Sequence, residues 1–246
     1  LSVLRTFLAP SMLQNAVRNI RRGNEEGRQF EIANAYLPRS LPVSGQPEEK
    51  KRLALAIWGN KCDFFDLKGA AEALEEEFHF RLSCGRAEIP WLHPGVSARL
   101  MLGEKEVGCI GELDPAIALS LGLDKKVYLG ELDLEALYPG MSAEAKFVNL
   151  PRFPAVKRDL ALVADEDVTC AQVEEELMRA CKYVTKAELF DVYRGGQVPE
   201  GKKSMAFTLT FTPDEHAEKA FTPEALDGFV RKILGNLKFK LNVELR

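Results

Sequence analysis

Apolar and polar residues alternate strictly in one stretch near the C-terminal end of the chain. Met205, Phe207, Leu209 and Phe211 are separated by small or hydroxyl-bearing residues, and a period of two places them on one face of a β-strand. The same alternation over residues 238–245 predicts another strand. Each strand therefore presents one apolar face, which must be covered by another element.

Helical signals separate the strands of this part. Thr169 and Gln172 have the spacing of a capping box, which predicts that a helix begins there. The predicted elements are a strand at 159–164, this helix, strands at 184–193 and 204–212, a helix from Thr222 and Pro223 to about Gly235, and the strand at 238–245. The order β-α-β-β-α-β is that of a ferredoxin-like domain.

The first part of the chain has a different pattern. Leu13, Val17 and Ile20 recur at helical spacing, with Ser11 as the expected N-cap and Gly23 after the last turn. The following elements are a strand at 28–36, a hairpin loop at 38–51, a strand at 52–58, a helix at 66–78 capped by Asp66, strands at 79–84, 98–102, 106–112 and 126–133, and a short helix at 115–121. This order predicts a mainly antiparallel α+β module.

Length and composition fit two domains of a soluble protein. The chain has 246 residues, of which 46% are hydrophobic and 28% charged. Its apolar runs are much shorter than the roughly 20 residues that cross a bilayer. A segment with two prolines, 147–154, suggests a connection, so we expect domains at 1–146 and 147–246. The chain opens at Leu1 without a secretory signal, which we interpret as a cut through a longer protein.

Charge and cysteine content limit the classes of function. The net charge of −4 argues against a strongly basic nucleic-acid binder, so any RNA contact should be local or shared with another chain. The five cysteines form no CxxC pair, which fits reduced thiols in the cytoplasm. Neither a glycine-rich phosphate loop nor an HExxH motif is present. The sequence therefore predicts no catalytic residue and no metal site.

Three local clusters leave an alternative open. His93 between Trp91 and Gly95 suits a catalytic group, but a fixed turn with the imidazole bonded to backbone is favoured. Asp63 and Asp66 have a spacing that suits Mg²⁺, although a helix cap with a surface salt bridge is the preferred interpretation. The acidic run at 75–77 is most simply a solvated helix face.

These clusters also carry a family resemblance. The motifs are Leu1-Ser-Val-Leu-Arg5, Arg28-x-Phe-Glu31-Ile, Asp63-Phe-Phe-Asp66-Leu-Lys-Gly69, His93-Pro-Gly95-x-Ser97, Phe190-Asp191-Val-Tyr193 and Pro199-Glu-Gly-Lys202-Lys203-Ser204. In this combination and order the chain resembles the C-terminal part of the β chain of bacterial phenylalanyl-tRNA synthetase. It departs from the family at 33–35 and 216–220, which are expected to lie in a hairpin and a loop.

The resemblance implies a function for each part. Residues 1–146 would be a class II synthetase-like module without chemistry, in which Arg28 and Glu31 are relics of an ATP-contacting motif. It would pack against the catalytic α subunit in an (αβ)2 assembly, phenylalanine–tRNA ligase. ATP and Mg²⁺ would act in that holoenzyme, and this fragment would hold no cofactor. Residues 147–246 would be a ferredoxin-fold anticodon-binding domain for tRNA(Phe). The alternative is an assembly scaffold without RNA contact.

An RNA surface can be placed on the predicted ferredoxin-like sheet. Both helices would cover one sheet face, which leaves the other for a splayed single-stranded loop. The expected contacts are Ser204, Thr208, Lys238, Lys240 and Asn242 on the free face, Phe190 and Tyr193 as stacking residues, and Arg152, Lys157, Arg158, Arg194, Lys202 and Lys203 at its rim. Taken one at a time, each of these is better explained as an ordinary solvated residue, whereas the group as a whole favours RNA binding.

Overall fold

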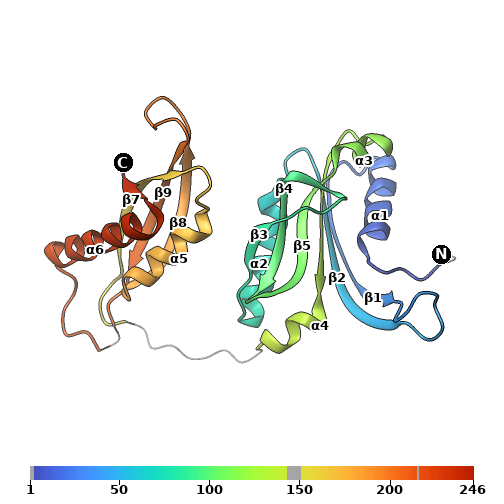
Figure 1. Cartoon of the computed structure of the whole chain (residues 1–246), viewed down its shortest axis with the longest axis horizontal. Helices are drawn as coiled ribbons and strands as arrows, with labels where there is room; N and C mark the ends of the chain where they lie inside the picture. Colours follow the sequence, from blue (N-terminus) through green and yellow to red (C-terminus); the bar gives the residue numbers. More distant parts are fainter. Residues whose placement is uncertain (1–2, 143–150, 215) are drawn as a thin grey trace. The chain divides into compact units, whose positions relative to one another are not determined.

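The computed structural model describes residues 3–142, 151–214 and 216–246. The chain divides into two compact units, Leu1–Ala145 and Lys146–Arg246 (Figure 1). Residues 147–150 of the predicted connection at 147–154, and the first two residues of the Leu1–Arg5 motif, lie outside the described residues. In the described part of the chain, no helix is both long enough and apolar enough to span a membrane.

The first unit is built on a six-stranded antiparallel sheet with the order β1-β2-β6-β5-β4-β3. Its strands are β1 (Gly27–Leu37), β2 (Glu48–Gly59), β3 (Ser83–Arg86), β4 (Leu92–Leu102), β5 (Lys105–Leu113) and β6 (Lys126–Asp133). The predicted hairpin of β1 and β2 is confirmed. The strand predicted at 79–84 is wrong over 79–82, because His79 is a left-handed cap that ends the preceding helix and β3 begins only at Ser83.

Helices cover both faces of this sheet. Helix α1 (Ala9–Arg21) packs through Leu8 and Met12 on one face, where Ala54 and Ala56 of β2 allow a close approach. Helix α2 (Phe64–Phe78) packs on the other face, against alternate residues of the same strand. The short helices α3 (Pro115–Ser120), α4 (Leu134–Leu137) and η1 (Tyr138–Gly140) connect or follow strands. Alternate side chains of β2 therefore belong to two different cores, one under each helix.

The start of α1 corrects the predicted cap. Ser11 lies inside the helix and its hydroxyl donates to the carbonyl of Leu8. The cap comes instead from Glu131 of β6, whose carboxylate accepts the backbone amides of Leu8 and Ala9 at 2.8 and 2.9 Å. A carboxylate at a helix N-terminus satisfies amides that lack partners within the helix. Because Glu131 is remote in sequence, no local pattern indicates this cap.

The cap of α2 is also one turn earlier than expected. Asp63, not Asp66, is the N-cap: its carboxylate accepts the amides of Phe65 and Asp66. The Asp66 side chain accepts the Asp63 amide in return, at 2.9 Å. The two acids therefore form a reciprocal capping box, which starts the helix at Phe64.

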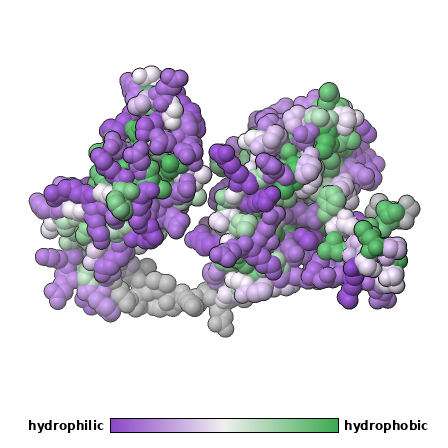
Figure 2. Space-filling view, viewed as in Figure 1, coloured by the Kyte–Doolittle hydropathy of each residue, from purple (hydrophilic) through white to green (hydrophobic). Residues whose placement is uncertain are grey.

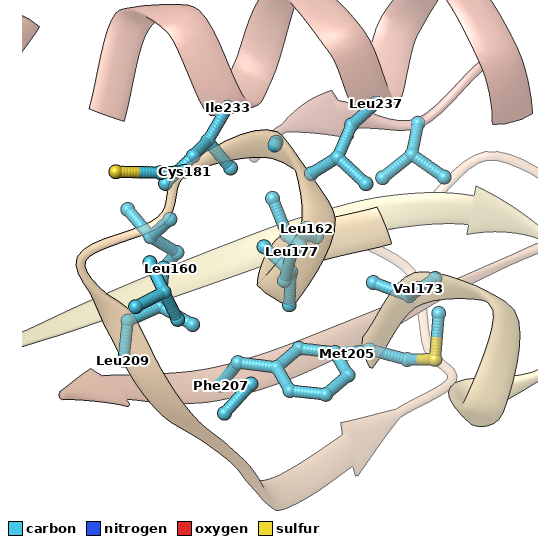
Figure 3. Packing of buried hydrophobic residues seen from close by; sticks show 14 of the residues in the cluster. Leu160, Leu162, Val173, Leu177, Cys181, Met205, Phe207, Leu209, Ile233 and Leu237 are labelled. Carbon is cyan, nitrogen blue, oxygen red and sulfur yellow. The ribbon is translucent and has the colours of Figure 1, made fainter. Parts of the chain in front are cut away.

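The second unit has a four-stranded antiparallel sheet with the order β10-β7-β9-β8. Its elements are β7 (Val156–Asp165), α5 (Cys170–Ala180), β8 (Val184–Tyr193), β9 (Lys202–Phe211), α6 (Pro223–Leu241) and β10 (Glu244–Leu245). Helices α5 and α6 lie on one sheet face (Figure 1). The alternating apolar row of β9 is confirmed, because Met205, Phe207, Leu209 and Phe211 are all buried under these helices. Figure 3 shows the first three of them in the core.

The last predicted strand is largely wrong. Helix α6 continues to Leu241 and ends at Asn242, which has a left-handed backbone with φ of 53°. Within it Ile233 and Leu237 are buried in the core, whereas Phe239 is 88% exposed. Ile233 and Leu237 are four residues apart and so lie on one face of the helix. Their packing in the core outweighs the apolar–polar alternation of residues 238–245. Only the two residues of β10 are strand in this segment.

Candidate nucleic-acid interface

The second sheet has one face that neither α5 nor α6 covers. On β9, Ala206, Thr208 and Thr210 point away from the core and are partly exposed. The register places Ala161 of β7 opposite Ala206 and Asp159 opposite Thr208. The Thr208 hydroxyl donates to the Asp159 carboxylate at 2.7 Å. This free face is therefore a shallow surface of small and hydroxyl-bearing side chains.

A β-bulge in β8 decides which of its side chains reach the free face. The register is interrupted between Leu189 and Asp191, with Phe190 inside the interruption. After the bulge, Asp191 lies opposite Ala206 and Tyr193 lies opposite Ser204. An uninterrupted alternation would have placed Asp191 and Tyr193 on the helix-covered side. The bulge thus brings a carboxylate and an aromatic ring to the free face.

The Tyr193 ring is held by residues from two other segments. The guanidinium carbon of Arg246 lies 5.1 Å from the ring centroid, within the range of a cation–π contact. A Cβ atom at Gly195 would lie 2.3 Å from the tyrosine hydroxyl. The lack of a side chain at Gly195 is what leaves room for this ring. In the connection between β8 and β9, the glycine with a left-handed backbone is Gly201, with φ of 79°.

Several residues predicted to hold RNA are placed elsewhere. Lys238 and Lys240 lie on α6, and Asn242 is its C-cap, so none of the three belongs to a free strand face. The Lys240 ammonium is 3.1 Å from the carboxylate of Glu176 on α5. Lys238 pairs with Glu244, also at 3.1 Å. The error follows from taking residues 238–245 as a strand.

The predicted rim residues also differ from one another. Arg194 makes two bonds to the Glu166 carboxylate, at 2.8 and 3.1 Å. Lys203 is buried and donates to the Glu166 carbonyl, so it is not a rim residue. Lys202 pairs with Asp165 at 2.8 Å. Three predicted rim cations are exposed and have no ion pair among the described residues: Arg152, Lys157 and Arg158.

Exposure separates the remaining predicted contacts. Phe190 is exposed at the bulge, and Tyr193 is partly exposed beside it. Ser204 is on the free side of β9, yet it is only 3% exposed. Sequence reasoning missed Asp191, Arg246 and Ala161, which lies opposite Ala206. The Phe-Asp-Val-Tyr motif pointed to Asp191, but the sheet face on which the Asp191 side chain lies depends on the bulge.

The clusters of the first unit have structural partners. The Gly95 amide donates to Nδ1 of His93 at 2.9 Å, which confirms the expected imidazole–backbone bond, although His93 lies in β4 rather than in a turn. The Asp63–Asp66 pair is the capping box of α2, as favoured, and Asp66 also pairs with Arg28 at 3.1 Å. No group of three or more His, Cys, Asp or Glu residues suited to a metal is found where the chain is described.

Glu75 corrects the expected solvated face at 75–77. Its side chain is buried, and only Glu76 and Glu77 are exposed. Burial raises the pKa of Glu75 above its ordinary value, whereas the Leu82 amide and Arg81 act in the opposite sense. The acidic run is therefore a solvated face over two of its three residues.

The predicted relic motif of β1 is engaged in structural bonds on opposite sheet faces. Arg28 pairs with Asp66 of α2, while Glu31 accepts from Arg5 at 2.7 Å on the other side. The face that carries Glu31 is occupied farther along by α1 and by Trp58. These side chains do not form a cradle for the phosphates of ATP, which requires donors that converge on one place.

A groove lies between β1 and α2. Its volume is about 540 Å³, and Leu55, Ile57 and Leu67 contribute apolar lining. Phe30 and Phe65 also line it and are 71% and 70% exposed. β1 is the outer strand of its sheet within the described residues. In the second unit, by contrast, hydrophilic residues predominate on the face seen in Figure 2.

Comparisons with known proteins match both units. Residues 1–134 match the family described as "Phenylalanyl tRNA synthetase beta chain CLM domain", and residues 151–246 match "Ferredoxin-fold anticodon binding domain". The antiparallel α+β architecture and the ferredoxin-like fold expected from the sequence are thereby confirmed.

Curated relatives agree over the whole chain. A protein of Clostridium tetani named "Phenylalanine--tRNA ligase beta subunit" is 35% identical over 244 residues, covering 98% of this chain. Proteins of the same name from Syntrophotalea carbinolica and Halalkalibacterium halodurans are 35% and 32% identical over 259 residues, and each match covers the full chain. The chain spans 31% to 32% of the length of these three relatives. The chain belongs to the phenylalanyl-tRNA synthetase β-chain family.

Proposed function

We propose that this chain works within a phenylalanine–tRNA ligase, an ATP-dependent aminoacyl-tRNA synthetase of the cytoplasm. In this proposal the second unit, residues 147–246, binds the anticodon region of tRNA(Phe). The first unit, residues 1–146, is an inactive class II synthetase-like module that docks on a catalytic α subunit in an (αβ)2 enzyme. The name and the extent of the matching relatives support this assignment.

The arrangement around Tyr193 is the observation that carries the RNA proposal. Tyr193 offers an aromatic ring beside the flat floor of Ala161 and Ala206, and Asp191 adds a carboxylate that accepts hydrogen bonds from the N–H groups of a base. Unstacked bases of RNA loops are bound in this way, by stacking and by contacts to their edges. Stacking on one aromatic side chain contributes about 1–3 kcal/mol per base.

Charge limits how strongly this face binds alone. The chain carries a net charge of −4, and two basic residues at the rim of the face, Arg194 and Lys202, have local acidic partners. Phosphate contacts provide most of the affinity for nucleic acid at low salt. The isolated chain should therefore bind tRNA weakly and with strong salt dependence, and firm binding should need the rest of the enzyme.

The decisive experiment uses the assembled αβ enzyme with Tyr193→Ala. We expect the Kd for tRNA(Phe) to rise about tenfold, since the loss of one stacked base is in the range of 1–3 kcal/mol. Tyr138→Ala removes an exposed tyrosine from the first unit and serves as the matched control. An unchanged Kd for Tyr193→Ala, at equal salt and with intact assembly, would contradict the proposal.

We assign ATP and Mg²⁺ to the holoenzyme and not to this chain. The residues here do not fit the nucleotide, because Arg28 and Glu31 are held by Asp66 and Arg5 on opposite faces of β1. An ATP titration of the isolated chain should show no Mg²⁺-dependent binding. Tight binding would revive the possibility that this part of the chain has its own enzymatic site.

The groove between β1 and α2 favours the second candidate function, assembly. An apolar groove with two aromatic rings exposed at its edge is typical of a protein interface. We propose that Phe30 and Phe65 contact the α subunit. If assembly is the only role of the chain, footprinting will protect no anticodon nucleotide, while capture of the α subunit will still succeed.

A further inference from the structure

Arg246 approaches the proposed RNA face from the sheet edge opposite to Tyr193. Its backbone amide donates to the carbonyl of Ala161 on β7 at 2.8 Å, next to the short pairing of β10 with β7. Tyr193 is on β8, the other outer strand of the sheet. The two side chains meet with the guanidinium carbon 5.1 Å from the ring centroid. A residue at one edge thus contacts the aromatic residue of the other edge.

Several basic residues of the second unit have an acidic partner, and Arg246 differs from them. Arg194, Lys202 and Lys240 each have a carboxylate partner within 3.1 Å. Within residues 3–142, 151–214 and 216–246, the side-chain partners of Arg246 are the Tyr193 ring and the neutral Gln197 amide oxygen. Arg246 is also exposed. It is therefore a positioned cation whose charge no acidic side chain offsets.

Its geometry suits a phosphate. A guanidinium in cation–π contact with an aromatic ring still has N–H groups at its edge that can donate to phosphate oxygens. A base stacked on Tyr193 carries its own phosphate a short way along the backbone. The contact to Gln197 and the bond to Ala161 hold the arginine in place before RNA arrives, which lowers the entropy cost of binding.

We propose that Arg246 binds a backbone phosphate of the RNA next to the base that stacks on Tyr193. The inference rests on the proposed function and deepens it, because it places a cation directly beside the aromatic ring of this face. It also explains how a chain of negative net charge holds an RNA strand at this place: one fixed cation stands beside the stacking ring.

Salt dependence separates this role from simple support of the ring. Each phosphate contact contributes about 0.7 to the slope of log Kd against log salt for single strands. Arg246→Gln in the assembled enzyme should raise the Kd for tRNA(Phe) about three- to tenfold and lower that slope by about 0.7–1. Arg246→Lys should keep the slope while losing part of the affinity, because the charge remains and the planar guanidinium with its paired N–H donors does not.

Arg231→Gln is the matched control, since it removes an exposed arginine of α6 whose side chain bonds only the nearby Asp227 carbonyl among the described residues. A raised Kd for Arg246→Gln with an unchanged slope would show that Arg246 only supports Tyr193, and would overturn the inference. An unchanged Kd would do so as well. The proposed function is tested separately: if Tyr193→Ala leaves the Kd unchanged, the RNA face itself is misassigned.

Discussion

The carboxylate of Glu131 and the backbone amide of Leu8 are joined by a buried hydrogen bond of 2.8 Å, although 123 positions separate them in the sequence. Glu131 is 5% exposed and lies in the middle of the sheet of the first unit. Through this bond and the bond to Ala9, a central strand fixes where α1 begins. The helix cap is thus a tertiary contact, and its loss should affect the whole first unit.

Glu131→Ala should lower the free energy of unfolding of the first unit by about 2 kcal/mol. The estimate combines the loss of a helix cap with amides left buried and unbonded. Urea denaturation followed by tryptophan fluorescence measures it, since Trp58 and Trp91 lie in the same core. Glu104→Ala, in an exposed turn, is the control. Equal stability of the two variants would show that Glu131 does not hold α1.

Glu131 should also make the stability depend on pH. Burial raises its pKa in the folded state, although the amides of Ala9 and Leu8 act in the opposite sense. A carboxyl group with a raised folded-state pKa binds more protons when folded, so its contribution to stability falls as pH rises above the unfolded-state value of about 4.3. Glu131→Gln should flatten this part of the curve. Identical pH profiles for variant and parent would contradict the expectation.

Gly195→Ala should weaken tRNA binding without unfolding the domain. The new Cβ atom would lie 2.3 Å from the hydroxyl of Tyr193, so the ring must move from its place on the free face. We expect a rise in Kd for tRNA(Phe) close to that of Tyr193→Ala, about tenfold. Gly196→Ala is the control, because nothing lies within 4 Å of a Cβ atom there. Equal affinities of the two alanine variants would refute this role of Gly195.

Phe30→Asp should impair assembly with the α subunit. A charge at an exposed position of the groove costs the folded chain little, but it must lose water when a partner covers the groove. We expect at least a tenfold weaker complex, or about 1.4 kcal/mol, measured by co-purification and analytical ultracentrifugation. Leu119→Asp changes an equally exposed leucine on α3. If both variants assemble like the parent, the α subunit contacts another surface.

Two substitutions in α6 test where the helix ends. Leu237→Ala should destabilise the second unit by about 2–5 kcal/mol, because it empties a fully buried site. Phe239→Ala should change the stability by no more than about 0.5 kcal/mol, since that ring is in solvent. Thermal unfolding followed by circular dichroism measures both. A strand at 238–245 would give a large effect at Phe239, and would contradict the helix.

Local chemistry made some elements predictable. The capping box of Thr169 and Gln172 starts α5 as expected, since its partners are three residues apart. Thr222 and Pro223 start α6 in the same way. The row of β9 is correct because its apolar side is fully buried and its other side is polar. The family motifs likewise depend only on residue order, and they indicated both domains.

The tertiary structure decided what depends on distant partners. Glu131, not Ser11, caps α1, because a buried carboxylate reaches its N-terminus from another strand. Lys238 and Lys240 are helical because core packing at Leu237 continues α6 through a segment that alternates.

In the candidate site, too, some features follow from the local sequence and others only from contacts between distant segments. The sequence alone indicated Tyr193 as a candidate stacking residue and predicted a sheet face without helices. One extra residue at Phe190 reverses the facing of every side chain after it, and so puts Asp191 and Tyr193 on that face. Strand pairing sets that register, and only the folded sheet brings Arg246 to the ring from the opposite edge. Sequence spacing determines which residues belong to an element, whereas contacts between elements determine which of them meet.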